Sequence, residues 1–401
     1  MNWLIVEDAL RDRKGHWFEY VSTFRQGLKE LGDEVTVLAD REAEAFVREG
    51  LQSLPILPSS IWHRMSDGAG RLARYARVPV HAWQTIRAMR RYFATSPEHD
   101  VIFVPTVLVH HLLGWTWLIK RHLRHGKTRI ILFFPNAPIG CNLQSGATDW
   151  MPSPTTQLFR RLLRWLAPEV KGGRVILGAE THPMRQALSS LSGVPFTYFP
   201  HPVTPVTSVR ADRVLPGETV MGSYGGARYE KGNDILYRGI AEFSGRYPDP
   251  RVRFVLQCVE GFIEERRPLE NNARVTWLTR YFGDGEYPKQ LAHTHVMLLP
   301  YRLSSYRLRV SRVAVEAMVN GIPIVVTRGT TLADQAAEFG AAIQCEDGNP
   351  HSVGEAIFEA ERNYGTLAAK ARATAARAQA HFSVKHFRDC VSSVSSSGSC
   401  G

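Results

Sequence analysis

The chain has 401 residues, of which 44% are hydrophobic, and carries a formal net charge of +11. This length allows two α/β domains, each with a core of its own. No apolar run reaches the roughly 18 residues of a transmembrane helix, and the N-terminal stretch MNWLIVEDALRDRKG is typical of a strand followed by charges, not of a signal peptide. The positive charge favours a phosphate-bearing partner or an anionic membrane surface.

The cysteines indicate neither a disulfide framework nor a metal site, because they are five in number and widely spaced. They are Cys141, Cys258, Cys345, Cys390 and Cys400. His293 and His295 have no carboxylate or cysteine at ligand spacing, so no metal site is predicted there either. We therefore expect a reduced, cytoplasmic setting.

Short apolar runs that predict strands alternate along the chain with stretches of helical periodicity, such as residues 17–31. The expected strands are Trp3–Val6, Val35–Ala39, Val101–Pro105, Arg129–Phe134, Val175–Leu177, Thr197–Phe199, Val220–Gly222, Arg253–Gln257, Val275–Leu278, Val296–Pro300 and Ile324–Thr327. This alternation predicts an α/β fold with parallel sheets covered by helices on both faces.

A break in this pattern predicts two domains of similar size. Residues 202–217, PVTPVTSVRADRVLPG, lack helical periodicity and are typical of a linker. We expect an N-terminal domain over 1–203, a linker over 204–217, a second domain over 218–365, a helical segment over 366–391 and a tail over 392–401. The low-complexity tail is expected to be disordered.

The second domain opens with a glycine-bearing turn between a strand and a helix, in VMGSYGGARYEKGNDILYRGI (220–240). Gly225 and Gly226 would let backbone N–H groups approach an anion, while Arg228 and Lys231 supply positive charge beside a helix N-terminus. Neither the Walker pattern nor Gly-x-Gly-x-x-Gly is present. The alternative is a loop with two solvated basic residues.

A carboxylate, Glu316, stands in the almost wholly apolar stretch VSRVAVEAMVNGIPIVVT (310–327). We expect a helix here that ends at Asn320-Gly321 and a buried strand after it. An unpaired buried ion costs on the order of several kcal/mol, so Glu316 either pairs within the protein or binds a polar ligand. Combined with the basic loop, it predicts a site for a nucleoside diphosphate, with the carboxylate on the ribose.

Three stretches resemble retaining glycosyltransferases of the GT-B fold, family 4 in particular. GGARYEKG (225–232) is similar to their diphosphate loop, and LLPYRLSSYRLRVSRVAVEAMVNGIPIVVT (298–327) to their donor-sugar segment. GHWFEYVSTFRQGLKELGDEVTVLA (15–39) resembles their first N-terminal loop and helix. The resemblance implies GT-B architecture, with two Rossmann-like parallel-sheet domains facing a cleft and the segment 366–391 crossing back to the N-terminal domain.

The resemblance also implies catalytic and donor-binding roles. Arg228 and Lys231 would hold the donor diphosphate and neutralise the leaving group, and Glu316 would hold the ribose. Gly15 and His16 would face the donor phosphates and the acceptor. No metal or cofactor is then needed, because the cations stabilise the developing charge.

The sequence departs from the family at two positions. The first Glu of the usual Glu-x7-Glu is Leu308, which leaves the identity of the sugar open. Nearby Tyr306, Arg309 and Ser311 offer hydroxyls and a second cation instead; a solvated arginine is the alternative for Arg309. The Arg that the family commonly has two residues nearer the strand is Gly226 here.

The implied reaction transfers a sugar, hexosyl in kind, from a nucleotide-diphosphate sugar to a hydroxyl acceptor with retention. The acceptor is expected to be a glycan or lipid-linked intermediate. A non-catalytic nucleotide-sugar binding protein and a GT-B epimerase are the alternatives, although no convincing set of acid/base residues for an epimerase can be named. A periplasmic binding protein is disfavoured because no signal peptide is found.

Two further features belong to the N-terminal half. His110 and His111 follow a strand end and are candidates for contacting the acceptor or donor sugar; the alternative is that they are satisfied helix residues. Residues 61–93 interleave seven arginines with aromatic and aliphatic residues, a pattern that suits an anionic membrane surface or, alternatively, a solvated basic face. No nucleic-acid motif is present. We thus expect a cytoplasmic enzyme, peripheral at the inner membrane face.

Overall fold

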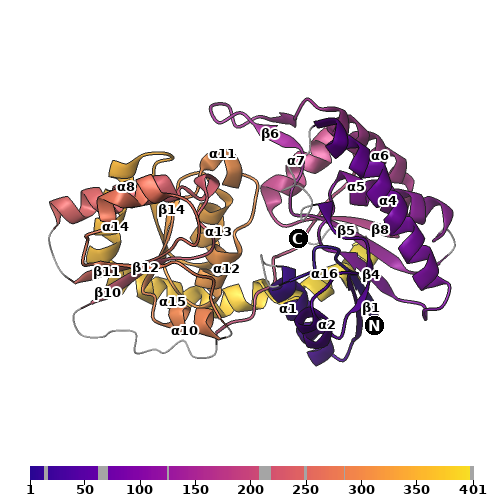
Figure 1. The fold of residues 1–401 in the computed structure, drawn as a ribbon, viewed down its shortest axis with the longest axis horizontal. Helices are drawn as coiled ribbons and strands as arrows, with labels where there is room; N and C mark the ends of the chain where they lie inside the picture. The colour runs from indigo at the N-terminus through magenta and orange to yellow at the C-terminus, as the bar shows by residue number, and fades with distance from the viewer. Residues whose placement is uncertain are drawn as a thin grey trace. The chain divides into compact units, whose positions relative to one another are not determined.

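The computed structural model describes residues 1–12, 17–61, 71–123, 126–206, 218–247, 251–283 and 285–397. The chain divides into two compact units, one formed by Met1–Pro202 with the C-terminal residues from Val384, the other by Val203–Ser383. Each unit is built on a parallel sheet flanked by helices (Figure 1). The central strands are buried at every position, which requires cover on both faces.

The first unit contains a seven-stranded sheet in the order β3-β2-β1-β4-β5-β8-β9. Its strands are β1 (Asn2–Val6), β2 (Glu34–Asp40), β3 (Leu54–Leu57), β4 (Val101–Val104), β5 (Arg129–Phe134), β8 (Val175–Ala179) and β9 (Thr197–Tyr198), and β6 (Ile139–Cys141) pairs with β7 (Thr148–Trp150) in a separate antiparallel hairpin. Its helices are α1 (Trp17–Glu30), α2 (Ala45–Leu51), α4 (Arg71–Phe93), α5 (Val109–Arg121), α6 (Pro154–Lys171), α7 (His182–Ser192) and α16 (Val384–Ser397). The strand order reverses between β1 and β4.

The second unit contains a six-stranded sheet in the order β12-β11-β10-β13-β14-β15. Its strands are β10 (Thr219–Ser223), β11 (Val252–Gln257), β12 (Val275–Leu278), β13 (Val296–Leu299), β14 (Ile324–Thr327) and β15 (Ala342–Cys345). Its helices are η1 (Tyr229–Lys231), α8 (Asn233–Arg246), α9 (Ile263–Arg266), η2 (Arg267–Leu269), α10 (Glu286–Ala292), α11 (Leu303–Tyr306), α12 (Arg312–Val319), α13 (Thr331–Phe339), α14 (Pro350–Arg362) and α15 (Tyr364–His381). The order reverses between β10 and β13, and ligands of open α/β sheets bind at such switch points.

The C-terminal helical segment consists of two helices that meet at Phe382-Ser383. The second, α16, belongs to the first unit, and Figure 1 shows this yellow helix among the indigo and purple elements. Its Phe387 ring packs edge-on against Phe24 with the centroids 4.7 Å apart. The tail predicted to be disordered from residue 392 is instead helical to Ser397, because Val394 packs against the same core; residues 398–401 lie outside the described residues.

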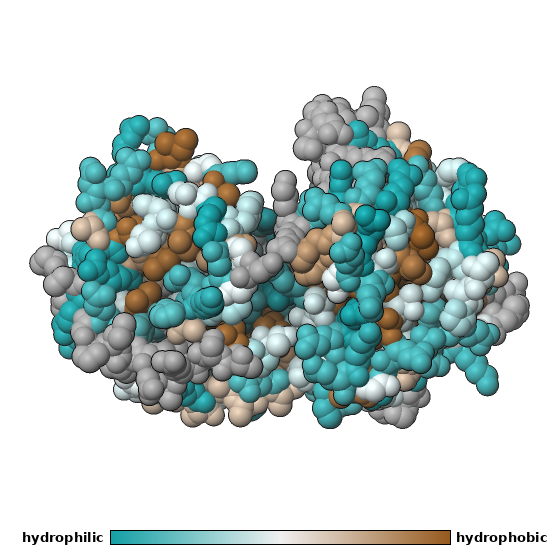
Figure 2. Space-filling model, turned by 60° about the horizontal axis from the view of Figure 1, so that its bottom comes forward, coloured by the Kyte–Doolittle hydropathy of each residue, from teal (hydrophilic) through white to brown (hydrophobic). Residues whose placement is uncertain are grey.

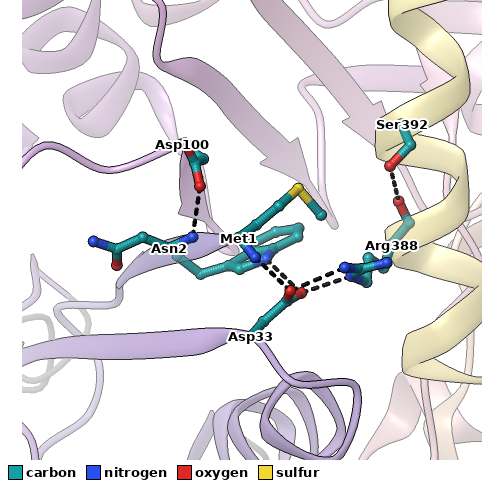
Figure 3. Close-up of polar contacts among 7 residues, drawn as sticks. Met1, Asn2, Asp33, Asp100, Arg388 and Ser392 are labelled. Atoms are coloured by element: carbon teal, nitrogen blue, oxygen red, sulfur yellow. Dashed lines mark hydrogen bonds and ion pairs between the residues drawn. The ribbon is translucent and has the colours of Figure 1, made fainter.

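A buried carboxylate joins α16 to the rest of its unit. Asp33, only 5% exposed, accepts two hydrogen bonds from Arg388 of α16, at 2.6 and 2.9 Å (Figure 3). The same carboxylate accepts from the Met1 amino group at 2.6 Å and from Trp3 Nε1 at 3.0 Å. Burial acts to raise the pKa of Asp33, but these contacts hold it below its usual 3.8.

Replacing Arg388 by methionine should lower the free energy of unfolding of the first unit by about 1.5–3 kcal/mol, because a buried carboxylate loses its charged donor. Since the pKa of Asp33 is lowered in the folded state, its stabilising effect is present above the unfolded-state value of 3.8 and is lost as pH falls through the folded value. Urea unfolding at pH 7 and at pH 3 should therefore show a smaller difference between wild type and variant at the lower pH. An equal difference at both would contradict this account.

On the face that Figure 2 shows, the hydrophobic residues among those described form small groups between hydrophilic ones. None of the helices in the described part of the chain is long and apolar enough to cross a membrane. The linker predicted at 204–217 falls mostly outside the described residues, which resume at 218.

Candidate functional site

The loop from β10 to α8 lies at the switch point of the second sheet. Hydrogen bonds to side chains hold both of its ends: Gly225 N–H donates to Gln257 Oε1 at 2.7 Å, and Arg228 N–H donates to Asn233 Oδ1 at 2.9 Å. Between them, the N–H groups of Gly226 and Ala227 have no acceptor among the described residues. The loop thus offers two unpaired backbone donors at a strand end, as anion-binding loops do.

Two glycines are required for this loop geometry. Gly232 adopts the left-handed conformation, with φ +65°, and a Cβ there would lie 2.0 Å from the carbonyl oxygen of Pro300. Gly225 has φ +87°, and a Cβ there would lie 2.7 Å from Lys231 Nζ. The loop after β13 therefore packs directly on Gly232, and the ammonium of Lys231 lies directly over Gly225.

Three cations, Arg228, Lys231 and Arg309, lie around this loop. Glu230 accepts from Arg228 at 3.4 Å and from Arg309 at 3.3 Å, so one carboxylate is shared by two guanidinium groups. Lys231 has no ion-pair partner in the part of the chain that the structure describes, and its Nζ lies 5.9 Å from the ring centroid of Tyr301. Burial, and secondarily the charge of Arg228, lowers the pKa of Lys231 to about 8. The cluster attracts an anion.

Glu316 is 7% exposed, and both of its carboxylate oxygens already have a partner in the protein. Arg312, one turn earlier on α12, donates from Nε to Oε1 at 2.8 Å, and the Tyr287 hydroxyl donates to Oε2 at 2.5 Å. The structure therefore realises the structural ion pair, the first of the two possibilities that the sequence left open. A carboxylate has further lone pairs, so a ribose hydroxyl could add to these contacts.

Replacing Arg312 by methionine should destabilise the second unit by about 3–5 kcal/mol, because Glu316 would keep its charge without its cation. The matched control is Arg328→Met, which removes an exposed guanidinium 2.9 Å from Glu346; a surface pair of this kind contributes about 0–1 kcal/mol. Chemical denaturation of both variants tests the difference. Equal losses of stability would contradict the burial argument.

The remaining donor-side residues follow β13. Ser311 is the N-cap of α12, where its hydroxyl accepts from Ala314 N–H at 3.3 Å. Tyr306, at the end of α11, packs against Tyr301 with ring centroids 4.5 Å apart, and burial raises the pKa of Tyr306 to about 12. Ser311 therefore has a local structural role, and both tyrosines belong to the core of this unit.

In the first unit, His110 is buried in the first turn of α5. It lies beside His111, His81 of α4 and Asp8, which follows β1. Asp8 and His81 were not predicted from the sequence; the acidic pair directly after the first strand was the available signal, since ligands bind at strand ends. Gly15 and His16 lie outside the described residues.

No protein-family model matches the sequence, and no curated protein is similar to it in sequence. Solved structures, however, match nearly the whole chain. HepE from Anabaena, in complex with UDP and glucose, has a TM-score of 0.65 at 13% identity, covering 99% of this chain and 100% of its own. Sucrose-phosphate synthase from Thermosynechococcus elongatus has a TM-score of 0.64 at 15% identity, covering 98% of both chains. An α,α-trehalose-phosphate synthase (UDP-forming) from Burkholderia vietnamiensis has a TM-score of 0.64 at 16% identity, covering 99% of this chain and 100% of its own. The chain has the GT-B fold.

The GT-B assignment confirms the predicted α/β class with two parallel-sheet units. In this GT-B chain the second unit brings together the expected donor-side residues around the ends of β10 and β13. They are Gly225, Gly226, Arg228, Lys231, Tyr306, Arg309, Ser311 and Glu316. Gln257, Glu230, Tyr287 and Tyr301 complete the group and were not predicted, since only side-chain contacts reveal them.

Proposed function

We propose that the protein is a glycosyltransferase that transfers a sugar, hexosyl in kind, from a nucleotide-diphosphate donor to a hydroxyl acceptor, of the retaining type found in family 4. The observation that supports this proposal is the β10–α8 loop, where the N–H groups of Gly226 and Ala227 and the ammonium of Lys231 have no polar partner among the described residues. A diphosphate matches these donors in charge and in hydrogen bonding. The HepE structures that share the fold contain UDP and UDP-glucose, which supports this choice.

In the proposed reaction the bond between donor C1 and the diphosphate oxygen breaks, and negative charge develops on the leaving diphosphate. Lys231 and Arg228 neutralise that charge, with Arg309 as a further cation, so the donor diphosphate needs no metal. The acceptor hydroxyl attacks C1 from the face that the diphosphate leaves. A β-phosphate oxygen takes its proton, so no nucleophile from the protein is required, and Glu316 is assigned to the ribose.

The first test is calorimetric binding of UDP, GDP, ADP and dTDP, without added metal, to the wild type and to Glu316→Gln. One nucleotide should bind, and the variant should weaken it by about 1–3 kcal/mol if the ribose contacts this carboxylate. Binding that is unchanged in a folded Glu316→Gln variant would restrict Glu316 to its ion pair with Arg312. Failure of every nucleotide to bind the folded wild type would refute the proposed function.

Leu308 favours a second candidate, a nucleotide-sugar binding protein without turnover, because the family's first glutamate is replaced by an apolar residue. The assay that separates the two is hydrolysis or transfer of the nucleotide sugar that corresponds to the nucleotide that binds. Release of free nucleoside diphosphate supports the enzyme. Tight binding without any release would support the binding protein.

We further propose that α4 binds an anionic membrane surface, so that a cytoplasmic enzyme reaches a glycan or lipid-linked acceptor, for polysaccharide or glycolipid biosynthesis. Its outer face exposes Val80 and Trp83 by 52% and 56%, and Arg87 lies over the Trp83 ring at 5.5 Å. Arg90 and Arg91 are exposed further along the helix. Residues 62–70, the earlier part of the predicted basic segment, lie outside the described residues.

Arg87→Glu with Arg91→Glu should weaken binding to vesicles of phosphatidylglycerol and phosphatidylcholine by more than tenfold, since each basic residue near such a surface contributes about 1 kcal/mol. Arg267→Glu with Arg328→Glu makes the same change in net charge on exposed residues of the second unit. Vesicle co-sedimentation compares the two double variants. If both double variants lose vesicle affinity equally, the effect is due to net charge alone. If the wild type does not bind vesicles, the membrane proposal is refuted.

A further inference from the structure

Four buried titratable side chains of the first unit converge at its switch point. Asp8 follows β1, His81 lies on α4, and His110 and His111 lie in the first turn of α5. Their exposed fractions are 6%, 4%, 3% and 5%, and one potential ligand atom from each lies within 4.8 Å of the others. This is the only such group found among the described residues, and the nucleotide chemistry proposed above does not use it as a unit.

The protons on this cluster can be assigned from the hydrogen bonds. His111 Nδ1 accepts from the backbone N–H of Leu108 at 3.1 Å, so a neutral His111 carries its proton on Nε2. That nitrogen lies 2.7 Å from Asp8 Oδ2 and donates to it. His111 is therefore fully paired and has no free lone pair directed into the cluster.

Two atoms of this cluster have no polar partner. Asp8 Oδ1 and His110 Nε2 are buried and have no hydrogen-bond partner among the described residues. His81 Nε2 lies 2.8 Å from Asp8 Oδ2, the oxygen that also accepts from His111. Each unsatisfied buried polar atom costs about 1–3 kcal/mol, so two in one cluster indicate a missing partner.

The chemistry of these atoms identifies the partner. Two imidazole nitrogens and one carboxylate oxygen form the ligand set that divalent transition metals favour, with one or more coordination positions left open. His81 Nδ1 lies 3.5 Å from Thr85 Oγ1, and a proton on Nδ1 leaves Nε2 free as a ligand. Metal-bound carboxylates are themselves oriented by hydrogen bonds from neighbouring groups, and His111 donates such a bond to Asp8.

We propose that Asp8, His81 and His110 bind a divalent transition-metal ion of the zinc type, with His111 as a positioning residue that holds Asp8. The ion would connect the end of β1 to α4 and α5. It lies in the first unit, whereas the diphosphate loop lies in the second, so the proposal is independent of the metal-free donor chemistry. No metal site was predicted from the sequence, in which Asp8 and His111 are 103 positions apart.

The test uses full-length protein freed of metal with a chelator and then titrated with Zn²⁺ or Co²⁺. We expect one equivalent of metal per chain, visible ligand-field absorption of the Co²⁺ form, and a rise in Tm on adding Zn²⁺. His111→Phe should bind about 10–100-fold more weakly, as removal of an outer partner does, and His81→Ala and His110→Ala should lose more than that. His201→Ala is the matched control, because His201 is equally buried and lies 2.7 Å from Glu180 outside any such group.

The wild-type measurement decides the proposal even if a variant does not fold. Less than a tenth of an equivalent of bound Zn²⁺ at micromolar metal, with no Co²⁺ absorption band, would overturn it and leave a buried water as the missing partner. Unchanged affinity in a folded His110→Ala variant would overturn it as well. Far-UV circular dichroism identifies the variants that are folded.

Discussion

Replacing Lys231 by alanine should reduce kcat/KM for the nucleotide-sugar donor by about 10²–10³-fold, the usual effect of removing one preorganised group that stabilises developing charge. The ammonium is placed by Gly225 beneath it and has no ion-pair partner among the described residues, so little competes with a diphosphate for it. Lys231→Arg keeps the charge and should retain more activity than the alanine variant. Steady-state kinetics on the three proteins tests the order.

The same residue predicts a pH dependence. Because the pKa of Lys231 is lowered to about 8, the cation is present below that pH and is lost as pH rises through it. Nucleoside diphosphate affinity of the wild type should therefore fall between pH 7.5 and 9.5, whereas Lys231→Arg, whose charge does not titrate there, should bind with a flatter profile. Parallel profiles in the two proteins would assign the pH dependence to another group.

Gly232→Ala should destabilise the second unit by more than about 3 kcal/mol. The left-handed backbone at φ +65° is strained for alanine, at about 1–3 kcal/mol, and the new methyl would lie 2.0 Å from a backbone oxygen of Pro300 that no side-chain rotation can move. The diphosphate loop would be displaced with it, so donor binding should also weaken. Denaturant unfolding and calorimetry measure the two effects.

The control for this prediction lies six residues earlier. Gly226 is outside the left-handed region and has no atom within 4 Å of a built Cβ, so Gly226→Ala should change stability by less than about 0.5 kcal/mol. Comparing the two variants separates the effect of the contact with Pro300 from the general effect of replacing a glycine in this loop. Comparable destabilisation by both substitutions would show that the contact with Pro300 does not decide the conformation.

Glu316 shows how far local reasoning could reach into the site. The i to i+4 spacing from Arg312 was visible in the sequence, and such pairs meet on one face of a helix. The hydroxyl of Tyr287 comes from α10, 29 residues away, and could not have been inferred. The pairing of Glu316 with Arg312 could therefore be inferred from the sequence, whereas its contact with Tyr287 could not.

The strands show a similar division. The buried runs of β4, β5 and β14 are continuous and rich in β-branched and aromatic residues, and they were predicted with nearly the observed bounds. β3 and β15 were missed because each is only partly buried, and β3 contains Pro55. Edge strands carry a weaker pattern since only part of their surface contacts the core.

The sequence by itself determined the α/β class, the division into two parallel-sheet units, and the basic glycine loop of the second unit. These features are encoded locally, in runs of apolar residues and in turn residues. Such patterns can be recognised without knowing which distant residues contact them. Only the tertiary structure decided that Gly232 must remain glycine beneath Pro300, and that Asp8, His81 and His110 converge. Those contacts join residues far apart in the chain through the order of strands in the sheets, and no local pattern records that order.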